Sequence, residues 1–538
     1  MKKITPFFIT LLLLFFSHSA VSQSIVINEI LTSNTTINQD EDGTYQDWVE
    51  LYNTGAVSVN LLGFGLTDDA ALPYKWTFPN VSLGAGQYLL VYCDDKNRAT
   101  PGSPLHTNFK ISSSGEVITL TNASAVAINT VPATVIAQNI SYGRLPNGTG
   151  NFTFFAAVTP GAVNSTTGYS EVLPVPAFSH ESGFLTAGFN LSITTTVPGA
   201  SIIYTLDGSE PSSTNLTGTT YHYKNQYPLL PGQFTGSLLN KTFQSHTYSA
   251  PLAIADRSAL PNKIAAISTT YDFTPAYIPA NPIFKGTVVR AKVVKPGALD
   301  SKIITKTFYI SPQGTSRFAL PVASISIDEN KLFDYNDGIM VAGVDFDNWR
   351  LAHLTEAAPS EGDIANFMRH GRENERPVNF TYFINGAEVL NQDVGMRIHG
   401  GSSRTYQDKS LTLYSRTDYG DDTMSYKFFA DQTYDNFKGL VMHNSGNDFD
   451  QTMFRDAFCH GLSKNLHFTT KGYQPTTVFL NGEYWGMLSF RDKIDDDYFE
   501  RVYNIAKTDI QVLENEYWLV ENDGFADYTQ IVDYVTNN

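Results

Sequence analysis

Cysteine is nearly absent from this chain, because only Cys93 and Cys459 occur among its 538 residues. They stand far apart, in what the sequence suggests are different domains. We therefore expect no disulfide, and a fold that depends on its hydrophobic cores. Charge is scarce as well, at 17% of residues, against about a quarter in an ordinary globular protein. Small polar residues and glycine take its place.

Basic residues are the scarcer of the two signs, with 36 Lys and Arg against 53 Asp and Glu and a formal net charge of −17. Without a basic stripe, nucleic acid is excluded as a partner. The signatures H-E-x-x-H, Walker A, G-x-S-x-G, D-F-G and H-R-D do not occur either. The run His399-Gly400-Gly401 is similar to an esterase oxyanion loop, but no nucleophile elbow accompanies it.

Long apolar runs are confined to the N-terminus. Lys2 and Lys3 precede the apolar stretch Phe7–Phe16, and Ala20 and Ser22 suit the −3 and −1 positions of a cleavage site. A membrane anchor is the alternative, but this stretch is too short to span about 30 Å of hydrocarbon. The pattern predicts a secretory signal over residues 1–22, cleaved near Ser22, and a secreted or cell-surface protein with no membrane span in the mature chain.

Short strand patterns separated by turn signals follow over residues 23–165. They are Val26–Ile30, Asp47–Gly55, Leu62–Asp68, Lys75–Pro79 and Gly86–Tyr92. This spacing is typical of a β-sandwich. The pieces Asn28-Glu29, Asp47–Glu50, Leu66–Asp68 and Phe109–Leu120 resemble the lamin-tail domain, an immunoglobulin-like sandwich, which implies binding or spacing. Glu29, Asp47 and Glu50 permit a catalytic or metal role, but we interpret them as solvated or capping acids.

A second β-sandwich is predicted over residues 174–311. Ala200–Pro211 reads as a strand and a tight turn, and Gly286–Val294 and Ile303–Ile310 read as strands. The segment resembles the C-terminal β-sandwich of chitobiases and β-hexosaminidases, an accessory fold without the hydrolase carboxylates. Residues 221–248 read as a long loop. Its aromatic residues, Tyr223, Tyr227 and Phe234, offer a contact surface for a cell-surface glycan or matrix.

The most informative stretch is Val394–Ser415, at the centre of a third predicted domain over residues 318–538. Residues alternate with period two on both sides of a loop that contains Gly400, Gly401, Ser402 and Ser403. Lys409 opens the second strand. Loop N–H and hydroxyl donors with a following lysine can hold a polyphosphate, although a plain hairpin has the same pattern.

The sequence also predicts other secondary-structure elements of this domain. Phe333–Met340 predicts a strand and turn. Asp450 is a good N-cap for a helix that carries Arg455 in its first turns, where Arg455 either orders an acid or phosphate or pairs with Asp448. Asn481-Gly482 marks a hairpin tip.

Asp492 lies on the returning strand of that hairpin, and Asp495–Asp497 then open a helix. Acids at a helix N-terminus are favourable in themselves, so we assign no metal site there.

Three blocks resemble the CotH family of secreted or spore-coat atypical protein kinases. They are the run from Gly395 to Tyr414, Leu440–Phe458, and Val478–Asp495. The resemblance implies ATP and Mg²⁺ as cofactors and an extracellular protein as phosphoryl acceptor. It implies a nucleotide site made of Lys409, Arg397, Ser402, Ser403, Asp492 and Arg455. Asp492 stands where the family usually has glutamate and would hold Lys409 in place, as the lysine–glutamate pair does in other kinases.

The family's catalytic aspartate and asparagine and its metal-binding aspartate are not found here, so the catalytic residues stay unknown. The sequence predicts a multidomain fold, with two immunoglobulin-like β-sandwiches before an α+β kinase-like domain that ends incomplete. Two functions remain open. One is a secreted CotH-like protein kinase, with this chain lacking the catalytic half. The other is a non-catalytic extracellular or cell-surface protein that adheres to glycan or matrix.

Overall fold

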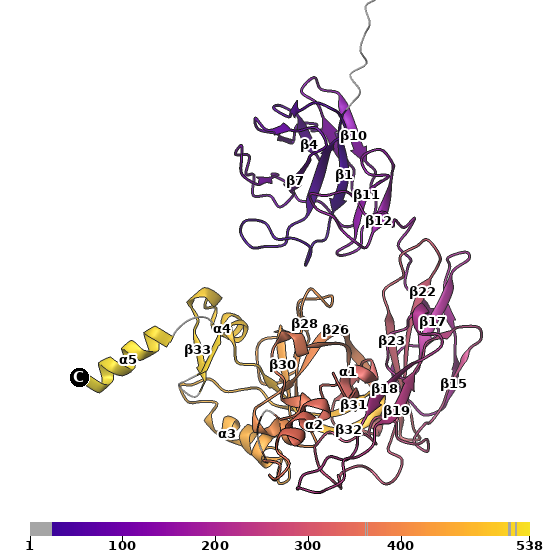
Figure 1. Ribbon diagram of the computed structural model, residues 1–538, viewed down its shortest axis with the longest axis vertical. Helices are drawn as coiled ribbons and strands as arrows, with labels where there is room; N and C mark the ends of the chain where they lie inside the picture. Colours follow the sequence, from indigo (N-terminus) through magenta and orange to yellow (C-terminus); the bar gives the residue numbers. More distant parts are fainter. Residues whose placement is uncertain (1–23, 361, 363, 515–517, 522–524, 538) are drawn as a thin grey trace, which may run out of the picture. The chain divides into compact units, whose positions relative to one another are not determined.

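The computed structural model describes residues 24–537 except 361, 363, 515–517 and 522–524 (Figure 1). The predicted secretory signal, residues 1–22, lies outside the described residues. Among the residues that are described, no helix has the length and apolar character needed to cross a bilayer. The chain is mostly β-sheet and divides into two compact units, Met1–Val172 and Leu173–Asn538.

The first unit is the β-sandwich that its short, turn-separated strands predict. One sheet has the order β12 (Asn151–Phe155), β11 (Ser141–Leu145), β1 (Ile25–Leu31), β2 (Trp48–Asn53), β7 (Tyr88–Tyr92), β8 (Leu105–His106). The other has the order β10 (Ala127–Val131), β9 (Ile118–Thr121), β4 (Gly65–Thr67), β5 (Trp76–Thr77), and β3 (Val59–Asn60) pairs with β6 (Ser82–Leu83). Trp48 and Leu31 are fully buried against Tyr92 in the core.

Two acids of this sandwich correct the sequence interpretation. Glu29 and Glu50 are fully buried rather than solvated, and they face each other across β1 and β2. Glu50 accepts hydrogen bonds from the Asn28 side chain and from the backbone N–H of Gly161. Asp47 is partly buried and accepts a hydrogen bond from the backbone N–H of Asn34 in a neighbouring loop. Strand β2 therefore places the polar carboxyl group of Glu50 in the interior, where hydrogen-bond donors are present to satisfy it.

The second unit contains a single twelve-stranded sheet. Its order is β20 (His246–Thr247), β17 (Ser201–Thr205), β22 (Thr287–Val294), β23 (Ile304–Ile310), β14 (Gly183–Leu185), β26 (Ala387–His399), β25 (Arg376–Ile384), β24 (Val322–Ser326), β31 (Gln474–Leu480), β32 (Glu483–Asp492), β30 (Gly439–His443), β27 (Ser410–Tyr414). Strand β26 has 13 residues and pairs with β25 along one edge. On its other edge, its first residue pairs with β14 and its last five residues pair with β27. The sheet thus crosses the predicted boundary between the second and third domains.

Strand β27 pairs with both β30 and β26, which closes the last seven strands into a ring. Val394, Met396 and Ile398 of β26 point into the ring, as do Leu411 and Leu413 of β27, and all are buried in its core. The residues between them face outward. The predicted strand, loop and strand of residues 394–415 is confirmed, including its period of two.

The insertion at residues 221–248 is not a long loop. It forms a hairpin of β18 (Thr219–Tyr223) and β19 (Leu239–Phe243), and Tyr221, Tyr223 and Phe243 enter the core of the closed ring. Tyr227 is also fully buried, and its hydroxyl accepts from the N–H of Gly343. Only Phe234 of the three predicted glycan-contacting aromatics is exposed. The aromatic side chains of Tyr223 and Tyr227 are buried, which the sequence alone did not reveal, so these two residues pack in the core instead of forming a contact surface.

Smaller pairs complete the unit: β13 (Ala177–Phe178) with β16 (Ile193–Thr194), β15 (Phe189–Leu191) with β21 (Leu252–Ile254), β28 (Met424–Ser425) with β29 (Asn436–Phe437), and β33 (Val512–Glu514) with β34 (Trp518–Glu521). The helices are α1 (Glu329–Phe333), α2 (Gly343–Ala352), α3 (Arg455–Ser463), α4 (Asp496–Tyr503) and α5 (Phe525–Asn537).

Two local predictions in this unit were wrong. Phe333 ends helix α1 instead of starting a strand, because the Asp334 side chain accepts from the N–H groups of Asn336 and Asp337 and makes a turn. Helix α3 begins at Arg455, and Asp448 rather than Asp450 accepts the N–H of Arg455.

Candidate anion-binding site

The glycine–serine loop between β26 and β27 is organised by one buried side chain, Arg404. Its guanidinium donates to the carbonyl oxygens of Gly400, Ile398, Phe367 and Arg369. The first two belong to the loop and the end of β26, and the last two to a separate segment, residues 366–369. A planar fork of N–H donors suits such divergent acceptors. Arg404 thus fixes the loop to that segment, a role the sequence interpretation missed.

Lys409 points into the molecule, not toward a ligand. Its ammonium donates to the carbonyl oxygens of Arg404 and Tyr406 and lies 3.7 Å from the centre of the Phe367 ring. The side chain is fully buried. Burial, with the nearby charge of Arg404, holds the pKa of Lys409 well below its ordinary value. In this structure Lys409 supports the loop from inside, and its predicted contact with nucleotide phosphates stays a prediction.

The predicted pairing of Lys409 with Asp492 is wrong. Strand register places Leu413 beside Leu440, and Leu440 beside Asp492. Asp492 is therefore level with Leu413, four residues or about 13 Å along the strand from Lys409. Its carboxylate accepts instead from the Tyr434 hydroxyl and from the N–H of Gly472, and it pairs with Arg501.

Arg397 lies on the outer face of β26 and lines a pocket of about 200 Å³. Its guanidinium is 3.5 Å from Glu375 and 4.3 Å from the centre of the Tyr414 ring, and a quarter of the side chain is exposed. Arg369, His370, His399 and Arg404 also line this pocket, and Asp and Glu are absent from its described lining. A pocket of this size with basic walls suits an anion such as a phosphate group.

The pKa of His399, which lines this pocket, is shifted far from its ordinary value. Burial, together with His443, Lys471, Arg404 and Lys493, lowers the pKa of His399 to about 3. The imidazole is therefore neutral at physiological pH, and Nδ1 lies 3.0 Å from the Thr412 hydroxyl. Burial, the larger cause, disfavours charge of either sign, and only the smaller contribution of the neighbouring cations favours a negative ligand.

Ser402 and Ser403 begin the short helical turn Ser402–Thr405, next to Gly400 with its φ of +99°. A second loop, residues 444–455, lies beside this turn, because Tyr406 stacks on Phe449 at 4.5 Å. Arg455, the first residue of α3 at the end of that second loop, is more than half exposed and pairs with Asp448 at 3.1 Å. The structure therefore brings the two predicted serines and Arg397 to one end of the ring. Arg455 follows on the neighbouring loop, held by an acid.

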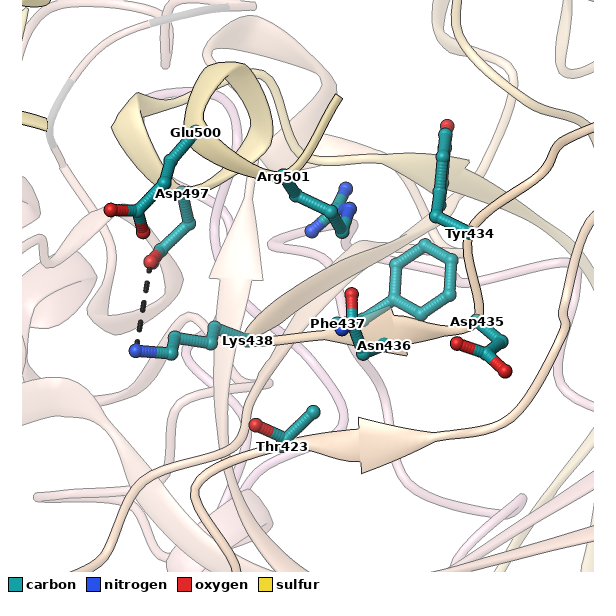
Figure 2. A pocket seen from close by; sticks show the side chains of 9 residues that line it. All are labelled: Thr423, Tyr434, Asp435, Asn436, Phe437, Lys438, Asp497, Glu500 and Arg501. Atoms are coloured by element: carbon teal, nitrogen blue, oxygen red, sulfur yellow. Dashed lines mark ion pairs between the residues drawn. The ribbon is translucent and has the colours of Figure 1, made fainter. Parts of the chain in front are cut away.

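A second pocket, of about 310 Å³, lies between β29 and α4. Figure 2 shows Lys438 aimed at Asp497, with Phe437 and Arg501 on the other side. Arg501 lies 4.7 Å from the centre of the Phe437 ring and pairs with Asp492. Asp435, Asp497 and Glu500 line this pocket, whereas the described lining of the Arg397 pocket contains no acid, so it offers an anion less than the Arg397 pocket does.

Within the part of the chain that the structure describes, two acidic groups have the spacing of metal ligands. Asp495, Asp496 and Asp497 form one, but Asp495 caps α4 and pairs with Lys493, and Asp497 pairs with Lys507. Asp40, Asp94 and His106 in the first unit form the other, where the Lys96 ammonium contacts both aspartates. Lysine side chains thus occupy the cation positions in both groups.

Comparisons with known families assign parts of the chain. Residues 396–533 match the family described as CotH kinase protein, residues 18–134 match Lamin Tail Domain, and residues 191–308 match Fn3 associated. No curated protein matches the chain. The chitobiase-type resemblance of the second domain stays a prediction. Each match covers less than half of the sequence. The matches therefore identify three segments of the chain: a Lamin Tail Domain segment, an Fn3-associated segment and a CotH kinase segment. The CotH kinase segment includes the glycine–serine loop and the strands and helices that follow it.

Proposed function

We propose that residues 318–538 form the nucleotide-binding part of a secreted CotH-like protein kinase, which transfers a phosphoryl group from ATP to an extracellular protein. Residues 23–165 and 174–311 are its accessory β-sandwich modules. The observation that carries this proposal is the Arg397 pocket. Its basic walls take Arg397, His399 and Arg404 from the CotH-matched segment, and Arg369 and His370 from residues that precede that segment. Phosphoryl transfer depends chiefly on positioning a charged phosphate and stabilising its charge.

The residues present fit a phosphate group better than they fit its metal. Arg397 can donate to phosphate oxygens, whereas the Arg369 guanidinium already donates to the Asp345 carboxylate and contributes its charge to the pocket wall. The loop that carries Ser402 and Ser403 lies at the same end of the ring. Bound ATP would supply the phosphoryl group, and Mg²⁺ would neutralise charge on its oxygens. Mg²⁺ prefers carboxylate ligands, and the described lining of the pocket contains none. We therefore name no magnesium ligand in this chain.

Preorganisation is the second argument for Arg397. Its guanidinium contacts both the Glu375 carboxylate and the Tyr414 ring. Glu375 is shared with Arg416 and with the Tyr419 hydroxyl, so its charge is already divided among several donors. The guanidinium is thus held in place without being neutralised by a dedicated partner. A donor fixed before binding loses little conformational freedom when the phosphate arrives.

Replacing Arg397 with glutamine tests this function. We expect Arg397→Gln to weaken binding of Mg-ATP to the full chain by about tenfold to a hundredfold, because a charge-assisted hydrogen bond contributes about 1.5–3 kcal/mol. The measurement is titration calorimetry at fixed low salt, with inorganic triphosphate as a second ligand.

Lys427→Gln is the matched control, since it removes the same charge from an exposed position outside the pocket. Its affinity should equal that of the parent chain. Equal binding by all three proteins, or no binding by the parent, would overturn the proposed site.

A further inference from the structure

Helix α3 exposes an apolar face. Phe454, Phe458 and Leu462 follow one another at helical spacing, and Phe458 and Leu462 are 55% and 70% exposed. Leu466 and Phe468, just beyond the helix, are exposed as well. We call these five residues the α3 face. Contiguous exposed apolar side chains of this kind mark an interaction surface.

The α3 face lies beside α4. The Thr469 hydroxyl, next to Phe468, is 2.9 Å from the hydroxyl of Tyr503, the last residue of α4. Tyr503 and Ile505 are themselves partly exposed and apolar. The chain that leads on to α5 therefore starts at the edge of the α3 face.

Helix α5 is the complementary element. Phe525, Tyr528, Val532 and Val535 share one side of this helix by their spacing, and Val535 is 71% exposed. No residue of α5 is buried in the described structure. A helix of 13 residues is only marginally stable in water without tertiary packing. Its formation therefore calls for a partner surface.

We propose that α5 docks on the α3 face of the same chain. About 20 residues connect the end of α4, which lies at the edge of the α3 face, to the start of α5, and a chain of that length can span more than the length of α3, about 14 Å. A tether this short gives an effective concentration in the millimolar range, well above that of a second copy in solution. The occupant is thus α5 itself rather than another molecule.

Charge complementarity supports this choice. Lys464 and His467 border the C-terminal side of the α3 face, whereas His460 on α3 is already paired with Asp456 of the same helix. Helix α5 carries Asp527 and Asp533 and no basic residue. Docking would place these acids near the bases and would cover the apolar side chains of both helices. It would also brace the loop that carries Arg455, which immediately precedes the exposed part of α3.

Cys459 provides a built-in probe of this contact. It is an exposed free thiol on α3, and the other cysteine, Cys93, is buried in the first unit. Thr529 and Ile531 border the apolar side of α5, whereas Gln530 lies opposite. We would introduce a cysteine at each of these three positions in the full chain, oxidise it mildly without nucleotide, and map disulfides by peptide mass spectrometry.

We expect Thr529→Cys or Ile531→Cys to form an intrachain disulfide with Cys459 at least about tenfold faster than Gln530→Cys. Adding Leu462→Asp should remove this difference while leaving the far-ultraviolet circular dichroism unchanged. Equal rates for the three positions, or disulfides only between chains, would overturn the proposal. Because no nucleotide is present, the result is independent of whether the proposed kinase function holds.

Discussion

Substitution of Arg404 by alanine is expected to lower the free energy of unfolding of the second unit by about 3–5 kcal/mol. The guanidinium is buried and donates to carbonyl oxygens of the loop and of residues 366–369. Alanine would leave these acceptors without partners, and each unsatisfied buried acceptor costs about 1–3 kcal/mol. The effect should appear in urea unfolding of the full chain, followed by tryptophan fluorescence and fitted with a separate transition for each unit.

Two further variants separate the hydrogen bonds from the charge. Arg404→Lys keeps the charge but cannot reach divergent carbonyls with a planar fork, so it should recover only a minor part of the loss. Arg372→Ala removes a surface arginine that pairs with Asp418 and is mostly exposed, and its effect should stay below about 1 kcal/mol. A loss for Arg404→Ala no larger than that for Arg372→Ala would mean that the loop does not depend on this side chain.

The sequence predicted the local framework of the site because that framework depends on near neighbours. Alternation through residues 394–415 gave both strands, and Asn481-Gly482 gave the tip of the β31–β32 hairpin, where both residues have positive φ. These signals need only a few consecutive residues. The closure of the ring between β26 and β27 and the extension of the sheet to β14 depend on distant pairings, and single-sequence patterns do not carry that information.

The direction of the Lys409 side chain could be predicted from the sequence. Lys409 has the same parity as Leu411 and Leu413, so a period of two already places it on the inner side of the strand. The same holds for Asp492, which has the parity of Leu488 and Phe490. From the resemblance to kinases we expected both side chains to face a ligand, whereas the alternation of side chains along their strands places both inside the ring.

Arg369 shows the opposite case, because no sequence signal could have found it. It lies in an irregular segment between α2 and β25, and it reaches the Arg397 pocket only because Arg404 ties that segment to the glycine–serine loop. The Asp345 carboxylate pairs with it from α2. Such a site residue is positioned by tertiary contacts between segments far apart in the chain, and only the structure brings them together.

In the first unit, the buried acids control how stability responds to pH. Burial, and then the adjacent charge of Glu29, raises the pKa of Glu50 to about 8. Burial raises the pKa of Glu29 as well, and that of Asp47 to about 6. Thr159 donates to Glu29 and the N–H of Gly161 to Glu50. The segment that contains Thr159 and Gly161 is therefore held to the sandwich by these two carboxyl groups.

Stability of the first unit is expected to fall as the pH rises from about 4.5 to 8. The folded unit keeps a proton on Glu50 that the unfolded chain releases above its ordinary pKa, so the stabilisation is complete below pH 4.5 and is lost as the pH approaches 8. For a shift of this size the loss is on the order of 4 kcal/mol, or about 10 °C in Tm. Calorimetry of the full chain at pH 5, 6, 7 and 8 would measure this loss.

Glu50→Gln should flatten the dependence of Tm on pH, leaving the part due to Glu29 and Asp47, whereas the surface variant Asp69→Asn should retain the full dependence. A Tm for this unit that rises with pH over the same range would show that Glu50 is charged in the folded state, with its hydrogen bonds from Asn28 and Gly161 outweighing the cost of burial.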